Sequence, residues 1–163
     1  MNNFYKNKYW KIIFKRIFYL IIITFISPSC EEESLDEITL GTISANMGDS
    51  FRRHFDTGAK AAWISLPQSY DLKIYGSGGF DEISITVNSL VNISAKTYNS
   101  VQILFLDGNL FSPFPVEYNS TSATVTISAI DSKEVKGTFS GTIRCNQNNT
   151  TKKLSNGLFY VSF

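Results

Sequence analysis

The segment ATVTISAIDSKEVKGTFSGTI (residues 123–143) decides the fold class. Val125 and Ile127 alternate with threonine and serine, which is the pattern of a strand with one buried face. Asp131-Ser132-Lys133 then reads as a turn, and apolar side chains or glycines occupy every second position of Val135–Ile143. We therefore expect two antiparallel strands joined by a tight turn, with the glycines giving room for aromatic rings of a facing strand or for a bend.

The same alternation recurs through the chain after residue 37, without a convincing amphipathic helix. We expect strands of five to eight residues, and we expect the apolar run Val101–Leu106 to be buried on both faces. The sequence predicts an all-β domain: an antiparallel β-sandwich or a flattened β-barrel of about eight strands. The other expected strands are a first one around Ile38–Ile43, then Lys60–Leu66, Asp71–Tyr75, Glu82–Val87 and Leu154–Phe163.

Glycine-rich and polar segments mark the expected connections between these strands. Gly76–Gly79 is interpreted as a flexible connection, since no helix or Lys-Ser/Thr follows it as in a phosphate-binding loop. Asp107–Asn109 is interpreted as a hairpin turn and Asn146–Lys153 as a polar loop. Asn46–Ala59 fits either a strand pair or a loop.

The N-terminus has the architecture of a secretory signal peptide. Its first sixteen residues carry five lysines and arginines and no acid, and the ten residues Ile17–Ile26 are apolar except for Thr24. Ten residues fall short of the ~20 that a membrane-spanning helix needs. We expect a helical signal peptide at residues 1–29.

Cys30 follows this run after Ser27-Pro28-Ser29, and the segment resembles a bacterial lipoprotein signal, which ends on a cysteine that receives lipid. The acids Glu31, Glu32 and Glu33 resemble the surface-export signal of lipoproteins from the Bacteroidota. These resemblances imply lipidation of Cys30 and an acidic tether, residues 30–37, on the outer membrane at the cell surface. A plain signal peptide with an incidental cysteine is the alternative.

Residues 38–163 are expected to form a single domain. From Cys30 onward the chain has ten basic and fourteen acidic side chains, a formal charge of −4. Apart from Arg52-Arg53 there is no basic stripe, so nucleic-acid binding lacks its electrostatic footprint. If Cys30 carries lipid, Cys145 has no partner, and we expect a half-buried strand residue without special reactivity.

Three segments are similar to a family of small Bacteroidota lipoproteins. They are VTISAIDSKEVKGTFSGTI (125–143), SNGLFYVSF (155–163) and DLKIYG (71–76). In that family a strand, a charged turn and a V-x-G-T-F-S-like strand precede a final N-G-x-F-x-V strand. The resemblance implies an all-β domain and carries no activity with it, because the family has none assigned.

Candidate catalytic and metal-binding residues are sparse. His54 is the only histidine, so a zinc site or a Ser-His-Asp arrangement lacks partners, and an exposed strand or loop position is expected. Asp81-Glu82 and Asp107 could offer oxygen ligands to calcium, but the dense carboxylate alternation of a calcium loop is missing. We expect no metal and no cofactor.

Aromatic residues are the better candidates for ligand contacts. Trp and Tyr on a sheet face or at a loop tip can stack on sugar rings, although such residues more often pack a core. Phe111, Phe114 and Tyr118 are the expected contact residues, because Pro113 and Pro115 would hold their loop rigid.

We expect a membrane-anchored protein that acts without catalysis, as a binding or structural accessory module. Its partners would be the membrane through its lipid, and a glycan, a small ligand or an envelope protein. The alternative function is a secreted hydrolase of envelope or dietary polysaccharide, which requires two facing carboxylates in an aromatic-lined groove. An outer-membrane barrel is the structural alternative, but the expected strands are shorter than the roughly 9–11 residues of a spanning strand.

Overall fold

A computed structural model of the protein describes residues 38–48, 52–109 and 112–163. Within these residues the chain is all-β, as predicted, with ten strands and no helix. The expected signal peptide and the tether with Cys30 and its three following glutamates lie outside the described residues.

Most of the strands are longer than the five to eight residues expected, because the alternation continues through residues that look like turns. The strands are β1 Thr42–Met47, β2 Arg52–His54, β3 Thr57–Leu66, β4 Ser69–Gly78, β5 Asp81–Ser89, β6 Thr97–Tyr98, β7 Val101–Asn109, β8 Ser112–Ile130, β9 Glu134–Cys145 and β10 Thr151–Ser162.

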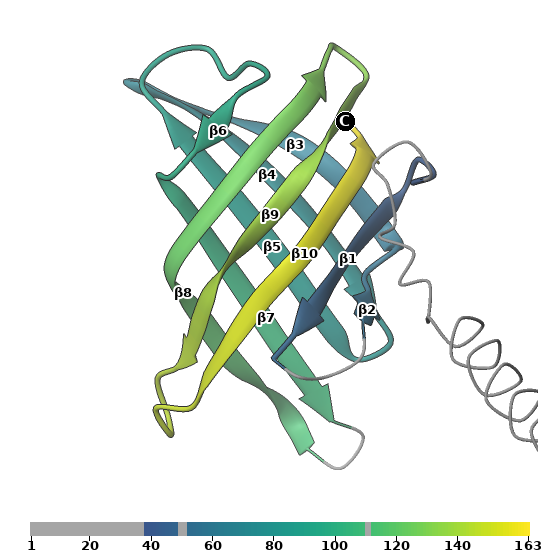
Figure 1. The fold of residues 1–163 in the computed structure, drawn as a ribbon, viewed down its shortest axis with the longest axis vertical. Coiled ribbons are helices and arrows are strands. Elements are labelled where there is room, and N and C mark those ends of the chain that lie inside the picture. Colours follow the sequence, from purple (N-terminus) through teal and green to yellow (C-terminus); the bar gives the residue numbers. More distant parts are fainter. Residues whose placement is uncertain (1–37, 49–51, 110–111) are drawn as a thin grey trace, which may run out of the picture. The chain divides into compact units, whose positions relative to one another are not determined.

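These strands form one sheet that closes on itself (Figure 1). From β3 to β10 each long strand pairs antiparallel with the next long strand in the chain. The ring closes where Ser162 of β10 meets Lys60 of β3, and β1 pairs along β10 and with β2. Of the two predicted architectures the protein has the barrel, with eight strands of six residues or more and the short β2 and β6.

The barrel interior is filled by apolar side chains, because every second residue of each strand points inward. On β4 and β5 these are Leu72 and Ile74, then Ile83, Ile85 and Val87, all at most 1% exposed. The outward positions between them carry lysine, tyrosine, serine and threonine. The fully buried side chains also include Ile43, Phe55, Phe105, Ile127, Ile143 and Phe159.

Gly76–Gly79 is not the flexible connection that was predicted, because β4 continues through Gly78. The backbone before β3 approaches β4 closely at these glycines. A Cβ atom on Gly76 would lie 2.1 Å from the carbonyl oxygen of Phe55, and one on Gly78 would lie 1.8 Å from that of His54. The glycines therefore permit a close backbone crossing at one end of the barrel.

The prediction of a hairpin turn at Asp107–Asn109 is also wrong, since β7 runs through Asn109. Asp107 keeps the inward direction of Phe105 and binds cationic side chains from β2 and β10. Lys152 and Lys153 similarly belong to β10 and not to a loop. Asp107 and Lys152 look like turn or loop residues in the sequence, but they form an ion pair with each other across the barrel and both belong to strands.

Three further expectations are corrected or completed. Val101–Leu106 is not buried on both faces: Ile103 and Phe105 point inward, whereas the alternate leucines are half-buried on the outer face. The first strand begins at Thr42, later than predicted. The undecided segment Asn46–Ala59 contains the end of β1, β2 and the start of β3, with β1 and β2 pairing as a hairpin.

Candidate functional site

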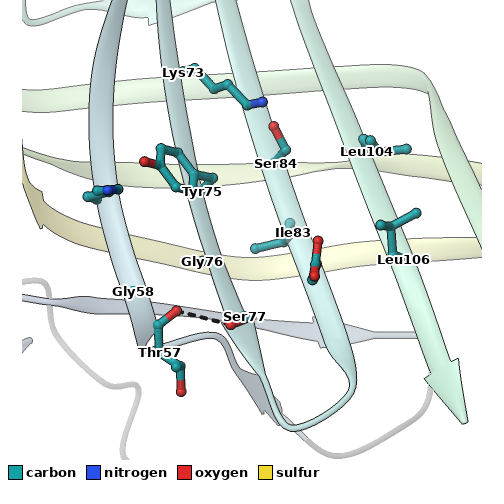
Figure 2. A pocket seen from close by; sticks show the side chains of 12 residues that line it. Thr57, Gly58, Lys73, Tyr75, Gly76, Ser77, Ile83, Ser84, Leu104 and Leu106 are labelled. Atoms are coloured by element: carbon teal, nitrogen blue, oxygen red, sulfur yellow. Dashed lines mark hydrogen bonds between the residues drawn. The ribbon is translucent and has the colours of Figure 1, made fainter. Parts of the chain in front are cut away.

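A groove of about 440 Å³ lies on the outer face of β3, β4, β5 and β7 (Figure 2). Its position follows from the strand register. Tyr75 on β4 lies between Lys60 on β3 and Ser84 on β5, and Ser84 lies opposite Leu104 on β7. Directly paired residues share a face of the sheet, so these four side chains form a row across four strands.

The groove exists because a small side chain occupies the middle of this row. Ser84 fills little space between larger neighbours, and Gly58 carries no side chain at the lower edge. The walls offer an aromatic ring, three aliphatic side chains, two ammonium groups, hydroxyls and one carboxylate. The side chains that supply them are Thr57, Lys60, Lys73, Tyr75, Ser77, Glu82, Ile83, Ser84, Leu104 and Leu106.

Tyr75 is the central aromatic residue of the groove. The ammonium nitrogen of Lys60 lies 5.4 Å from the centre of its ring, and that of Lys73 lies 5.8 Å from it. Both distances are within the range in which a cation is attracted to an aromatic face. The two lysines therefore hold the ring in place and present positive charge beside it.

A second groove of about 390 Å³ adjoins the first and shares Lys73, Ser84 and Leu104 with it. It continues the first groove toward β8 and is the more polar of the two. Its amide side chains are Gln102 and Asn119. Together the two grooves form a surface on which hydroxyl-rich molecules could find both donors and acceptors.

A separate charged cluster closes the end of the barrel near β2. Arg53 donates to Asp81 and, at 3.2 Å, to Asp107, and Lys152 donates to Asp107 at 2.5 Å. These side chains occupy inward positions and are 18–31% exposed. The Lys152 ammonium also lies 4.4 Å from the ring centre of Tyr118, so the cluster rests on the aromatic core.

The cluster shifts the ionisation of its members. Burial alone would raise the pKa of Asp107, but the hydrogen bonds and charges of Lys152 and Arg53 together lower it below its ordinary value. Burial alone would lower the pKa of Arg53. The charges and hydrogen bonds of Asp81 and Asp107 outweigh the effect of burial and raise this pKa above its ordinary value. Asp107 is thus held as a carboxylate by two cations. No metal-binding group of histidine, cysteine and acid residues occurs in the described part of the chain.

The structure separates the aromatic residues that were expected to act together. Phe111 lies outside the described residues, and Phe114 is 78% exposed at the start of β8. Tyr118 is only 6% exposed, with its ring 5.9 Å from that of Phe105 inside the barrel. Tyr118 is therefore a core residue and not a surface contact, because it falls on the inward face of β8.

His54 and Cys145 have the roles of ordinary strand residues. The His54 side chain is 54% exposed and its Nδ1 lies 3.8 Å from an Asp56 carboxylate oxygen. Cys145 is fully buried, more than the half-burial predicted, and is a free thiol. Across residues 38–48, 52–109 and 112–163, no helix is long and apolar enough to cross a membrane.

The sequence placed Tyr75 at the end of an expected strand but did not predict the groove around it. The available signal was the alternation in Asp71–Tyr75, which puts Lys73 and Tyr75 on the outer face. Lys60 and Leu104 line the groove because of the way β3, β4, β5 and β7 pair. Alternation within one segment does not predict which strands pair. Fold and groove together define a closed barrel, antiparallel except where β10 meets β3, with an open, polar and aromatic groove on its wall.

Comparisons with protein-family models, curated proteins and solved structures found no match.

Proposed function

We propose that this protein is a lipid-anchored lipoprotein of the outer membrane, exposed at the cell surface, that binds a glycan in the groove around Tyr75. The anchor is Cys30, and the export signal comprises the three glutamates that follow it. The proposed activity is binding without catalysis. The observation that carries the glycan proposal is the Tyr75 ring between two lysines on an open sheet face.

The chemistry of the groove matches that of a sugar chain. The C–H face of a sugar ring can pack on the aromatic ring and on Leu104 and Leu106, while its hydroxyls reach serine, threonine and amide groups. Lys60 and Lys73 add positive charge on both sides of Tyr75. This favours an acidic glycan, with carboxylate or sulfate groups, over a neutral one.

The arrangement of the acids favours binding over hydrolysis. A glycosidase requires two carboxyl groups that flank the scissile bond. Glu82 is the one carboxylate among the side chains that line the groove around Tyr75. The acids that do converge, Asp81 and Asp107, lie in the charged cluster and are engaged by Arg53 and Lys152.

Calorimetric titration with acidic and neutral oligosaccharides tests the proposal, with oligogalacturonides and cello-oligosaccharides as the probes. Tyr75→Ala should weaken binding of the acidic probe about tenfold or more, as loss of a central aromatic contact does. Tyr70→Ala is the matched control, because Tyr70 is 48% exposed and lies outside the groove. Equal affinity of the two variants, or release of new reducing ends by the wild type, would overturn the proposal.

A further inference from the structure

Six of the eight exposed large apolar side chains of the described residues gather at one end of the barrel. Phe80 and Phe114 lie at the end with the charged cluster. The others lie at the opposite end, where β3 leads into β4 and β10 finishes (upper end in Figure 1). They are Leu40, Trp63, Ile64, Tyr70, Leu90 and Val91, and they are 39–83% exposed.

Five of these residues form what we call the apolar rim: Trp63, Ile64, Tyr70, Leu90 and Val91. Strand pairing brings them together, because Tyr70 lies opposite residue 65 on one side and residue 89 on the other. The Trp63 ring stacks on that of Phe163 at 5.4 Å with an angle of 6° between the planes. A patch that combines Trp and Tyr with aliphatic tips is typical of interaction surfaces.

The tether joins the domain at this same end. Gly41 donates its backbone N–H to Tyr160 near the end of β10, and Thr42 pairs with Tyr160 as β1 begins. Ile38 is already packed, at 6% exposed. Seven residues lie between it and Cys30, and the eight residue-to-residue steps reach about 29 Å at most when fully extended. A lipid on Cys30 would therefore keep this end of the barrel near the bilayer.

We propose that the apolar rim rests on the phospholipid bilayer that holds the lipid of Cys30, as a second membrane contact. This inference depends on the anchoring proposed above. Trp63 and Tyr70 suit the headgroup level, where amphipathic rings are enriched, and Leu90 and Val91 suit the boundary of the acyl chains. The rim itself has no charged side chain, and Lys96 in the segment that follows it can meet lipid phosphate.

The orientation that results leaves the groove accessible. The groove lies on the wall of the barrel, between the rim and the charged cluster, and not at the end that would face lipid. One end of the barrel would contact the membrane while Tyr75 remains open to a polymer from outside.

The test uses the lipidated protein in phosphatidylethanolamine and phosphatidylglycerol vesicles, with and without brominated acyl chains. Trp63 is the only tryptophan after processing at Cys30, so its fluorescence reports the rim directly. We expect brominated lipid to quench most of its emission. Leu90→Ser combined with Val91→Ser should abolish the quenching while the protein still floats with the vesicles. Phe80→Ser, at the opposite end, is the control and should leave the quenching unchanged.

Protein that floats with the vesicles but shows no quenching would overturn the rim contact and leave the anchor intact. Protein that does not float would overturn both. If instead the lipidated protein forms dimers in detergent and the double variant is monomeric, the rim is a contact between two copies of the chain, which also overturns the proposal. An unchanged thermal midpoint of the double variant establishes that its fold is retained.

Discussion

The ring of Phe159 covers the backbone of Gly137. The two residues pair across β10 and β9, and a Cβ atom on Gly137 would lie 2.6 Å from the Cζ atom of the Phe159 ring. The reverse contact occurs two residues away, where the Phe139 ring covers Gly157 in the same fashion. The first contact confirms for Gly137 the prediction that glycines of β9 make room for aromatic rings, whereas Gly141 lies against the backbone of Ser122 and Ala123 and no ring. The two contacts between rings and glycines are specific to the register of the last two strands.

Gly137→Ala should destabilise the protein by about 1–3 kcal/mol, because the added methyl group meets a fully buried ring and the Thr126 carbonyl oxygen at 2.2 Å. Chemical denaturation followed by circular dichroism measures this change. Ser140→Ala on the outer face of the same strand is the control and should change stability by less than about 0.5 kcal/mol. If both variants unfold at the same denaturant concentration, the ring does not constrain this position.

Phe139→Ala should cost about 3–5 kcal/mol, as truncation of a buried phenylalanine does, since Phe139 is only 3% exposed. Its contact with Gly157 adds a second expectation. Gly157→Ala should cost less in the Phe139→Ala background than in the wild type, because the methyl group then enters vacated space. Phe80→Ala, at a residue that is 60% exposed, should change the thermal midpoint little. Strict additivity of Phe139→Ala and Gly157→Ala would contradict the packing described.

The alternation of the sequence predicts much of the barrel. It identifies the inward residues Val125, Ile127, Val135, Phe139 and Ile143, all buried, and the turn between their strands. Antiparallel pairing of successive strands follows, because short connections join neighbours. The alternation does not predict that the sheet closes into a barrel. That depends on the contact between Lys60 and Ser162, which are 102 positions apart, and no local pattern contains it.

The groove and the charged cluster were harder to predict for the same reason. Asp107 looks like a turn residue because it precedes Gly108, but its partners Lys152 and Arg53 lie 45 and 54 positions away in the chain. Likewise, Tyr75 becomes part of a groove only once Lys60 and Leu104 are placed on the strands beside it. Local chemistry identified candidate residues, and strand register decided which of them meet.

Asp107→Asn should reduce stability at neutral pH by about 1–2 kcal/mol, between the values for exposed and buried charged contacts. Because the pKa of Asp107 is lowered in the folded protein, its contribution is present above the unfolded pKa and is lost as pH falls through the folded pKa. The difference between wild type and variant should therefore shrink from about pH 5 toward pH 2.

Denaturant titrations at a series of pH values measure this difference, and Glu82→Gln, at an exposed carboxylate on the outer face, is the control. A gap between wild type and Asp107→Asn that stays constant down to the lowest pH would show that the lost charge is not the cause. Sodium chloride should reduce the gap only in part, since the cluster is 18–31% exposed.

Cys30→Ala should release the protein from the membrane fraction or leave it as an unprocessed precursor, because alanine cannot form the thioether to lipid. Cys145→Ala is the matched control: it alters the other cysteine, which is buried inside the barrel, and should leave the protein in the membrane fraction. Mass spectrometry of the mature N-terminus adds a readout independent of fractionation. The wild type should begin at a lipid-modified residue 30. A Cys30→Ala protein that is cut at the same place and stays with the membrane would rule out lipidation as the anchor, and the membrane contact of the apolar rim would then have to be explained without a tether.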